Sequence, residues 1–425
     1  MPCMQCGSPL NADYVFCPKC GATLEERSRT APHPFPESER PGPLLRPQPS
    51  AAWPHAVPPP PFPSGNNDFG FALYEQLGRK PGNLFFSPFS IRTALGMTYA
   101  GAKGKTAEEM AGALRFPPSD EVLHAAFARI IARLNAAGGG TYEMAVANSL
   151  WAQEGSPMLA TFAELAARYY GGGLFGVDFA GAAEAARARI NRWVEDKTRE
   201  RIRDLIPPGS LGVLTSLVLV NAVYFKGRWT VPFSKDATHD EPFHLHGGNR
   251  ARGPLMFRQD FLQYVKGDGF QAVDLSYRGG DVTMLVLLPD ERDGLPALEQ
   301  RLSARLLYDC LAQMSACTVK VYLPRFKVLW GTEDVGAVLS ALGMPTAFTR
   351  FAADLSGING YEPPHPMSLY IGKVFHKAFV ETNEEGTEAA AATAVEARLC
   401  GSSGSPPKPP PIPVFRADHP FLFAI

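Results

Sequence analysis

The chain lacks an excess of charge of either sign, because 41 lysines and arginines nearly balance 42 acidic residues. The formal net charge of -1 leaves no basic surplus to bind nucleic acid or an anionic membrane surface. No apolar run reaches the roughly 18 residues that cross a bilayer. The longest run, residues 211–225, is interrupted by polar side chains and indicates a buried strand. We therefore expect neither a nucleic-acid partner nor a membrane partner.

The N-terminus lacks the apolar core of a secretory signal peptide, which favours a cytoplasmic location and leaves a non-classical export route open. Cysteine is also scarce outside one cluster. Cys310, Cys317 and Cys400 show no disulfide framework and would be free thiols in a reducing compartment.

Catalytic signatures are absent as well. The 425 residues include nine histidines, and no GxSxG, HExxH or glycine-rich phosphate loop occurs among them. The sequence therefore gives no support to an enzyme.

Composition divides the chain into three parts: residues 1–24, a small cysteine-containing unit; residues 25–64, a linker; and residues 65–425, a globular domain. Thirteen prolines between Pro32 and Pro63 predict an extended, disordered spacer with polyproline character. The globular part shows helical spacing first and strand-like runs later, which is an α+β pattern. The expected helices are Asp68–Leu77, Ser90–Tyr99, Thr106–Leu114, Glu121–Ala136, Met158–Tyr169, Glu184–Thr198, Ala297–Met314 and Glu333–Leu342. The expected strands are Leu217–Phe225, Phe270–Leu275, Val282–Leu288, Thr318–Leu323 and Leu369–Glu381.

Four cysteines near the N-terminus have the spacing of a tetrahedral metal site: Cys3, Cys6, Cys17 and Cys20. Each CxxC pair precedes a glycine, which allows the tight turn that brings four thiolates to one zinc ion. So few residues cannot fold on an apolar core, so zinc would supply most of the folding energy. The alternatives are coincidental pairs or a redox motif, but a redox CxxC belongs on a βαβ unit. The segment resembles the short zinc ribbons of many bacterial proteins, which suggests a bacterial source, and its binding partner is unknown.

A segment of small residues follows the last long expected strand. With period two from Thr387, one face carries Thr387, Ala389, Ala391, Thr393, Val395, Ala397 and Leu399, and the charges of Glu388, Glu396 and Arg398 fall on the other. No proline interrupts residues 387–400, so every amide could join a strand ladder. An alanine-rich helix or a disordered loop is the alternative, because helical spacing also groups most of these charges.

The run Glu384–Thr393, followed by a variable loop and Phe415–Phe423, resembles the reactive-centre loop and C-terminal signature of the serpin family. Further stretches resemble family motifs in the same order: residues 83–90, 190–206, 219–229, 323–326 and 374–378. The resemblance covers residues from about 68 to 425. It implies helices around a large, mostly antiparallel sheet A, two further sheets B and C, and an exposed reactive-centre loop.

By resemblance, the protein is a monomeric inhibitor that traps a serine or cysteine protease as a suicide substrate. The protease cleaves the loop, and the loop then inserts into the main sheet as an extra strand. The hinge of that loop would be Glu384, Glu385, Gly386, Thr387, Glu388, Ala389, Ala390, Ala391 and Ala392. A cluster beneath the opening strands, the shutter, would be Ser87, Ser90, Asn221 and His376. The breach, where the loop begins to insert, would be Trp229, Arg325 and Glu384. For the shutter, the alternative is a buried polar cluster whose hydrogen bonds are satisfied and that has no gating role. For the breach, the alternative is a weak surface ion pair.

Counting fifteen residues from Gly386 places the reactive bond between Cys400 and Gly401. A loop one residue shorter would select Leu399, and one two residues shorter would select Arg398. A non-inhibitory serpin that acts as a binding or scaffold protein remains the alternative function. The small residues of the hinge favour inhibition, because non-inhibitory members of the family commonly carry bulky, charged or proline residues in the hinge.

Overall fold

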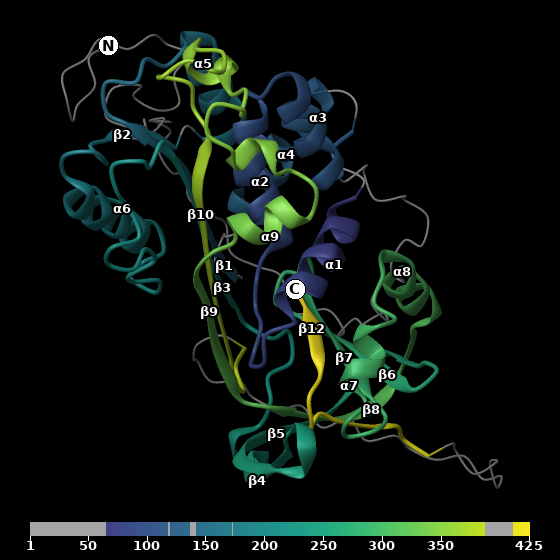
Figure 1. Ribbon diagram of the computed structural model, residues 1–425. Coiled ribbons are helices and arrows are strands. Elements are labelled where there is room, and N and C mark those ends of the chain that lie inside the picture. The colour runs from purple at the N-terminus through teal and green to yellow at the C-terminus, as the bar shows by residue number, and fades with distance from the viewer. Residues whose placement is uncertain (1–64, 118–119, 137–141, 172, 387–410) are drawn as a thin grey trace, which may run out of the picture. The chain divides into compact units, whose positions relative to one another are not determined.

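The computed structural model describes residues 65–117, 120–136, 142–171, 173–386 and 411–425. The chain divides into two units, Met1–Val57 and Pro58–Ile425, and every described residue belongs to the second. That unit combines helices with two β-sheets (Figure 1). In the part of the chain that the structure describes, no helix is long and apolar enough to span a bilayer.

The helices gather mainly in the first part of the unit, as their spacing predicts. They are α1 (Asn66–Leu77), α2 (Pro88–Tyr99), α3 (Gly104–Ala113), α4 (Asp120–Ala136), α5 (Ala160–Tyr170), α6 (Ala183–Lys197), α7 (Leu295–Glu299), α8 (Ala304–Gln313), α9 (Gly336–Ala341) and α10 (Ser356–Asn359). Three 3-10 turns are η1 (Lys235–Ala237), η2 (His246–Gly248) and η3 (Thr346–Phe348). Helix α2 shows why such a segment begins where it does. The Ser87 hydroxyl accepts a hydrogen bond from the Ser90 amide at 3.2 Å, and Pro88 occupies the first helical turn.

The first sheet has five strands in the order β2-β1-β3-β10-β9. Their bounds are β2 (Leu174–Val177), β1 (Tyr142–Gln153), β3 (Leu217–Gly227), β10 (Ile371–Thr382) and β9 (Phe326–Asp334). Strands β1 and β3 are antiparallel, as are β10 and β9. The central neighbours β3 and β10 are parallel, and β1 pairs with β2 in parallel. The sheet is therefore mixed, whereas the resemblance implied a mostly antiparallel one.

The second sheet has seven strands in the order β11-β8-β5-β6-β7-β12, with β4 paired to β5. Their bounds are β4 (His239–His244), β5 (Arg250–Lys266), β6 (Phe270–Ser276), β7 (Thr283–Pro289), β8 (Ser315–Pro324), β11 (Val414–Arg416) and β12 (Leu422–Ala424). The long strand β5 pairs with β4, β6 and β8. The two smaller sheets of the resemblance are continuous here through this strand.

Both faces of the first sheet are covered. Leu219 of β3 shares a buried cluster with Leu95 of α2, whereas the next residue, Val220, shares another with Ile190 and Val194 of α6. Successive side chains of a strand point to opposite faces, so α2 and α6 lie on opposite sides of the sheet (Figure 1). The centre of this sheet is therefore shielded from water on both sides.

Two expected helices differ from the structure. The predicted helix Ala297–Met314 is broken into α7 and α8, because the Ser303 hydroxyl accepts a hydrogen bond from the Leu306 amide and starts a new helix. The predicted helix from Glu333 begins later, at Gly336, because residues 326–334 pair with β10 as strand β9. The strands β1, β2, β4, β5, β9, β11 and β12 were not among the predicted strands.

Candidate functional site

Three polar residues form one rung across the centre of the first sheet. Asn148 of β1 lies opposite Asn221 of β3, and Asn221 lies opposite His376 of β10. Asn221 and His376 are fully buried. A buried amide or imidazole needs partners to offset its desolvation, so this rung marks the place where β1, β3 and β10 are joined by side chains as well as by backbone.

The rung is completed by the beginning of helix α2. His376 Nδ1 is hydrogen-bonded to Asn221 Oδ1, and the Asn221 amide nitrogen donates to Ser90 Oγ and to Asn148 Oδ1. The Ser87 backbone amide donates to His376 Nε2 at 3.2 Å. The structure thus brings together all four residues of the predicted shutter. It adds Asn148, which lies on a strand that the sequence analysis did not predict.

The protonation state of His376 follows from these partners. Its Nε2 accepts from a backbone N–H, so the ring proton lies on Nδ1 and is donated to the Asn221 carbonyl oxygen. Full burial of the ring lowers the pKa of His376 to about 3, because the imidazolium would lose its hydration. His376 is therefore a neutral hydrogen-bonding residue across the β3–β10 boundary.

The chain reverses direction immediately after β10. Asn383 and Gly386 exchange backbone hydrogen bonds of 2.8 and 3.2 Å, which closes a tight turn with Glu384 and Glu385 at its tip. Gly386 also forms an antiparallel bridge with Arg228, the residue that follows β3. The first residue of the returning chain is thus bridged on one side to the end of β3 and on the other to Asn383, just beyond β10.

The turn is held by the breach residues. Arg325, between β8 and β9, forms an ion pair with Glu384, whose side chain is almost fully buried. Trp229 stacks on Tyr277 with ring centroids 4.4 Å apart, and its indole N–H donates to the Asn383 carbonyl at 3.0 Å. The structure therefore brings all three predicted breach residues to the turn.

Electrostatics fix the charge of Glu384. Burial pushes the pKa of this carboxyl upward more than any other single cause. The hydrogen bonds from Arg325, from its own backbone amide and from Thr238, together with the charge of Arg325, nevertheless hold the pKa below its ordinary value. Glu384 is therefore an ionised carboxylate near neutral pH, and its charge is compensated by the Arg325 guanidinium.

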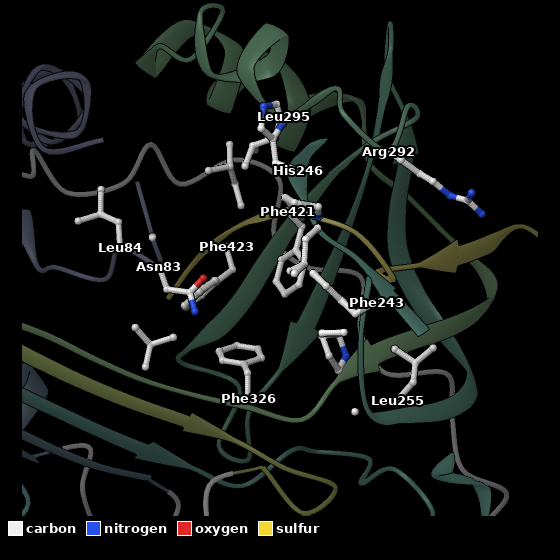
Figure 2. A pocket seen from close by; sticks show the side chains of 18 of the residues that line it. Asn83, Leu84, Phe243, His246, Leu255, Arg292, Leu295, Phe326, Phe421 and Phe423 are labelled. Atoms are coloured by element: carbon white, nitrogen blue, oxygen red, sulfur yellow. The ribbon is translucent and has the colours of Figure 1, made fainter. Parts of the chain in front are cut away.

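A cavity of about 670 Å³ lies beside the breach, since Arg325 is among the residues that line it. Figure 2 shows aromatic side chains at its wall, among them Phe326, Phe421 and Phe423. The Phe326 ring centroid lies 6.0 Å from that of Phe421 and 5.2 Å from that of Phe423. The apolar wall and moderate volume are those of a small-molecule site.

Other predicted residues lie outside the described residues: Thr387, Glu388, Ala389, Ala390, Ala391, Ala392, Leu399, Cys400 and Gly401 of the loop, and the zinc ligands Cys3, Cys6, Cys17 and Cys20. Within the described ranges, histidine, cysteine, aspartate and glutamate side chains do not gather in groups of three or more that could hold a metal.

The sequence matches two family models. The model of the serpin family, described as serine protease inhibitor, matches residues 64–425. A zinc-ribbon domain model matches residues 3–24.

Several curated proteins are similar over most of their length. The leukocyte elastase inhibitor of Xenopus laevis is 36% identical over 365 residues, which cover 84% of this chain and 93% of the relative. Serpin B6 of Macaca fascicularis is 39% identical, with 85% of this chain and 94% of the relative covered. A serpin-like protein of Thermococcus kodakarensis is 39% identical, with coverages of 84% and 80%.

Solved structures agree with these relatives. Uncleaved ovalbumin is 30% identical, with a TM-score of 0.74 and coverage of 85% of this chain and 94% of that one. Human thyroxine-binding globulin has the same TM-score at 26% identity, with coverages of 85% and 93%. With its mixed sheet, its reversing turn and these similarities, the chain belongs to the serpin family and has the serpin fold.

Proposed function

We propose that the chain is a suicide inhibitor of a serine or cysteine protease that inserts its cleaved loop between β3 and β10. The observation that carries this proposal is the position of Gly386. It bridges Arg228 at the end of β3 and pairs with Asn383 just after β10. A strand continuing from Gly386 in this direction would run antiparallel to both neighbours.

The pairing of the sheet supplies a driving force for this insertion. Strands β3 and β10 are parallel neighbours, and a parallel ladder is slightly less stable per residue than an antiparallel one. An inserted strand would replace that ladder with two antiparallel ladders, and each added backbone hydrogen bond contributes about 1 kcal/mol net. The small side chains on one face of residues 387–399 suit a strand that must enter between covered faces. The uncleaved protein is then metastable.

The shutter and the breach have separate roles in this proposal. The His376–Asn221 hydrogen bond crosses the boundary that must open, so it has to break before the strand passes the centre of the sheet. The breach keeps the turn at the end of that boundary, where the Arg325–Glu384 ion pair fixes one side. The chain is not an enzyme, and these residues act through hydrogen bonds and ion pairs.

The reactive bond in this proposal joins Cys400 to Gly401, with Leu399 as the alternative reactive residue. The protease nucleophile would attack the Cys400 carbonyl, the amine of Gly401 would leave, and an acyl-enzyme would remain attached to the inserting strand. A cysteine or leucine at this position suits a protease with an apolar specificity pocket. Relatives named leukocyte elastase inhibitors support a target of that kind.

The N-terminal unit would be a zinc ribbon in residues 1–24, joined by the linker 25–64 to the inhibitory domain 65–425. Cys3, Cys6, Cys17 and Cys20 are the residues that would hold the metal, because four thiolates suit tetrahedral zinc. The metal would stabilise the ribbon and have no part in inhibition.

The test is incubation of the full-length protein with purified elastases, chymotrypsin-like proteases, trypsin-like proteases and papain-like cysteine proteases. We expect a covalent complex that survives SDS and has the summed mass of the protease and the N-terminal part of the inhibitor. The protein with Thr387→Arg serves as the control that is cleaved without trapping. Cleavage of the loop by several of these proteases with no stable complex would contradict the proposal.

The aromatic cavity favours a second candidate, a non-inhibitory binding protein for an apolar small molecule. Thyroxine-binding globulin is a relative whose name states that it binds thyroxine. Titration with thyroxine or a fatty acid, followed by intrinsic fluorescence, tests the cavity directly. Binding together with equal melting temperatures before and after loop cleavage would favour this candidate over inhibition.

A further inference from the structure

A second ion pair holds the turn that starts the loop. Lys235 Nζ lies 2.6 Å from Glu385 Oε1, and the Glu385 side chain is only 12% exposed, against 67% for Lys235. The other carboxylate oxygen of Glu385 is buried and has no hydrogen-bond partner. The Lys235 ammonium therefore compensates a carboxylate that water reaches poorly.

The two cations at the turn come from different segments of the chain. Lys235 lies on η1, in the segment that follows β3, whereas Arg325 precedes β9, the partner of β10. The segment after β3 also binds the backbone of the turn. The Trp229 amide donates to the Glu385 carbonyl at 3.0 Å, and the Phe233 amide donates to the Glu384 carbonyl at 2.7 Å.

The charges around the turn show what Lys235 contributes to it. Glu381, Glu384 and Glu385 line one small cavity of about 260 Å³ together with Lys235 and Arg325. Without Lys235, adjacent carboxylates at the tip of the turn would share a single guanidinium. Repulsion between like charges and the burial of Glu385 would then both favour a turn that moves away from β3.

We propose that Lys235 is a positioning residue that holds the base of the reactive loop against the end of β3, with Gly386 already bridged to Arg228. This inference rests on the proposed inhibitory function and adds a residue to it. If the turn moves away from this position, the first residue of the inserting strand must find the end of β3 again after cleavage. Insertion then competes less well with hydrolysis of the acyl-enzyme, and more inhibitor is consumed as substrate.

The experiment uses the uncleaved full-length protein and the variants Lys235→Gln, Lys235→Arg and the exchange Lys235→Glu with Glu385→Lys. The matched control is Lys105→Gln. Lys105 is 75% exposed and pairs with the 18% exposed Glu109, away from the turn, at 3.5 Å. Hydrogen exchange of the amides of residues 383–386 is read by mass spectrometry. The inhibitor consumed per mole of trapped protease is measured with the target that forms the complex.

Loss of the Lys235–Glu385 ion pair predicts roughly fivefold faster exchange in Lys235→Gln and a similar rise in the ratio of cleaved to trapped inhibitor. Lys235→Arg and the charge exchange should restore both values, and Lys105→Gln should change neither. Equal exchange in Lys235→Gln and the wild type would overturn the inference. So would faster exchange that neither restoring variant corrects.

The two proposals fail in different ways. If the wild type traps no protease, the inhibitory function fails, and the exchange measurement alone then decides whether Lys235 holds the turn. If the wild type traps a protease but Lys235→Gln consumes no additional inhibitor, the inhibitory function stands and the role of Lys235 is refuted.

Discussion

Replacement of Gly386 by alanine tests whether the base of the loop must occupy the end of the β3–β10 boundary. Gly386 has a φ of +112°, and an added Cβ would lie 2.2 Å from the Gly227 carbonyl oxygen and 2.6 Å from Arg228 Cα and Trp229 N. These are backbone atoms of the segment that ends β3, so no side-chain rotation relieves the overlap. The turn itself would have to move away from β3.

Two contributions to the cost can be separated. The positive φ costs a non-glycine residue about 1–2 kcal/mol, and forcing a methyl group into packed backbone adds about 1–3 kcal/mol. Gly82 is the matched control, because its φ is +120° and an added Cβ would meet nothing within 4 Å. Gly82→Ala should therefore have the conformational cost alone.

The assay combines the melting temperature of the uncleaved protein with the inhibitor consumed per mole of trapped protease. Both variants should melt below the wild type, Gly386→Ala further than Gly82→Ala. Gly386→Ala alone should consume more inhibitor, because its hinge no longer starts between the strands. If the two variants match in both measurements, the contact between Gly386 and the end of β3 has no role in insertion.

Four further predictions concern the rest of the chain. Metal analysis should find one zinc per chain, and deletion of residues 1–64 should leave the rate of complex formation unchanged. Thr387→Arg should turn the inhibitor into a substrate, because insertion would bury an unpaired guanidinium at a cost of several kcal/mol; gels should show cleavage with no stable complex. Cleavage should release a fragment that begins at Gly401, by mass spectrometry, and should raise the melting temperature by calorimetry; a fragment beginning at Cys400 would instead select Leu399. Because the pKa of His376 is about 3 when folded and about 6.5 when unfolded, the unfolded chain binds more protons between these values. Urea unfolding of the uncleaved protein should therefore show stability falling as the pH drops from 7 toward 5, and less so in His376→Asn.

The helical half of the fold was accessible from the sequence, because its segments repeat apolar residues at helical spacing. Strands β3, β7 and β10 could be predicted from their largely apolar, buried runs, and β6 and β8 from the alternation of buried and partly exposed residues. Strand β5 was missed because Gly253 and Pro254 stand inside it and are typical of a turn. In the folded chain these two residues face β4, in a pairing that depends on distant segments and cannot be deduced from local pattern.

The residues of the candidate site were also predicted only in part. The resemblance named the shutter residues Ser87, Ser90, Asn221 and His376, and the structure brings them together. Asn148 had no signal of its own, because its role depends on the register that places it opposite Asn221. Lys235 was also missed, because its role depends on a contact between distant segments of the chain. Nothing in a sequence pairs a lysine in an exposed turn with a glutamate 150 residues later.

The positions of the turn and the rung along one boundary suggest an order of events. Gly386 lies at the end of the β3–β10 boundary, whereas the Asn221–His376 pair lies inside it, four residues before the Phe225–Val380 pair. An inserting strand would start at Gly386 and part the backbone pairs between Phe225 and Asn221 before it reaches the His376 side chain. The first pairs would exchange one backbone partner for another, with little net cost. At the rung the strand would have to break a buried side-chain bond whose donor and acceptor have no water to replace it. We therefore infer that the breach sets where insertion begins and that the rung sets the largest barrier to insertion before cleavage.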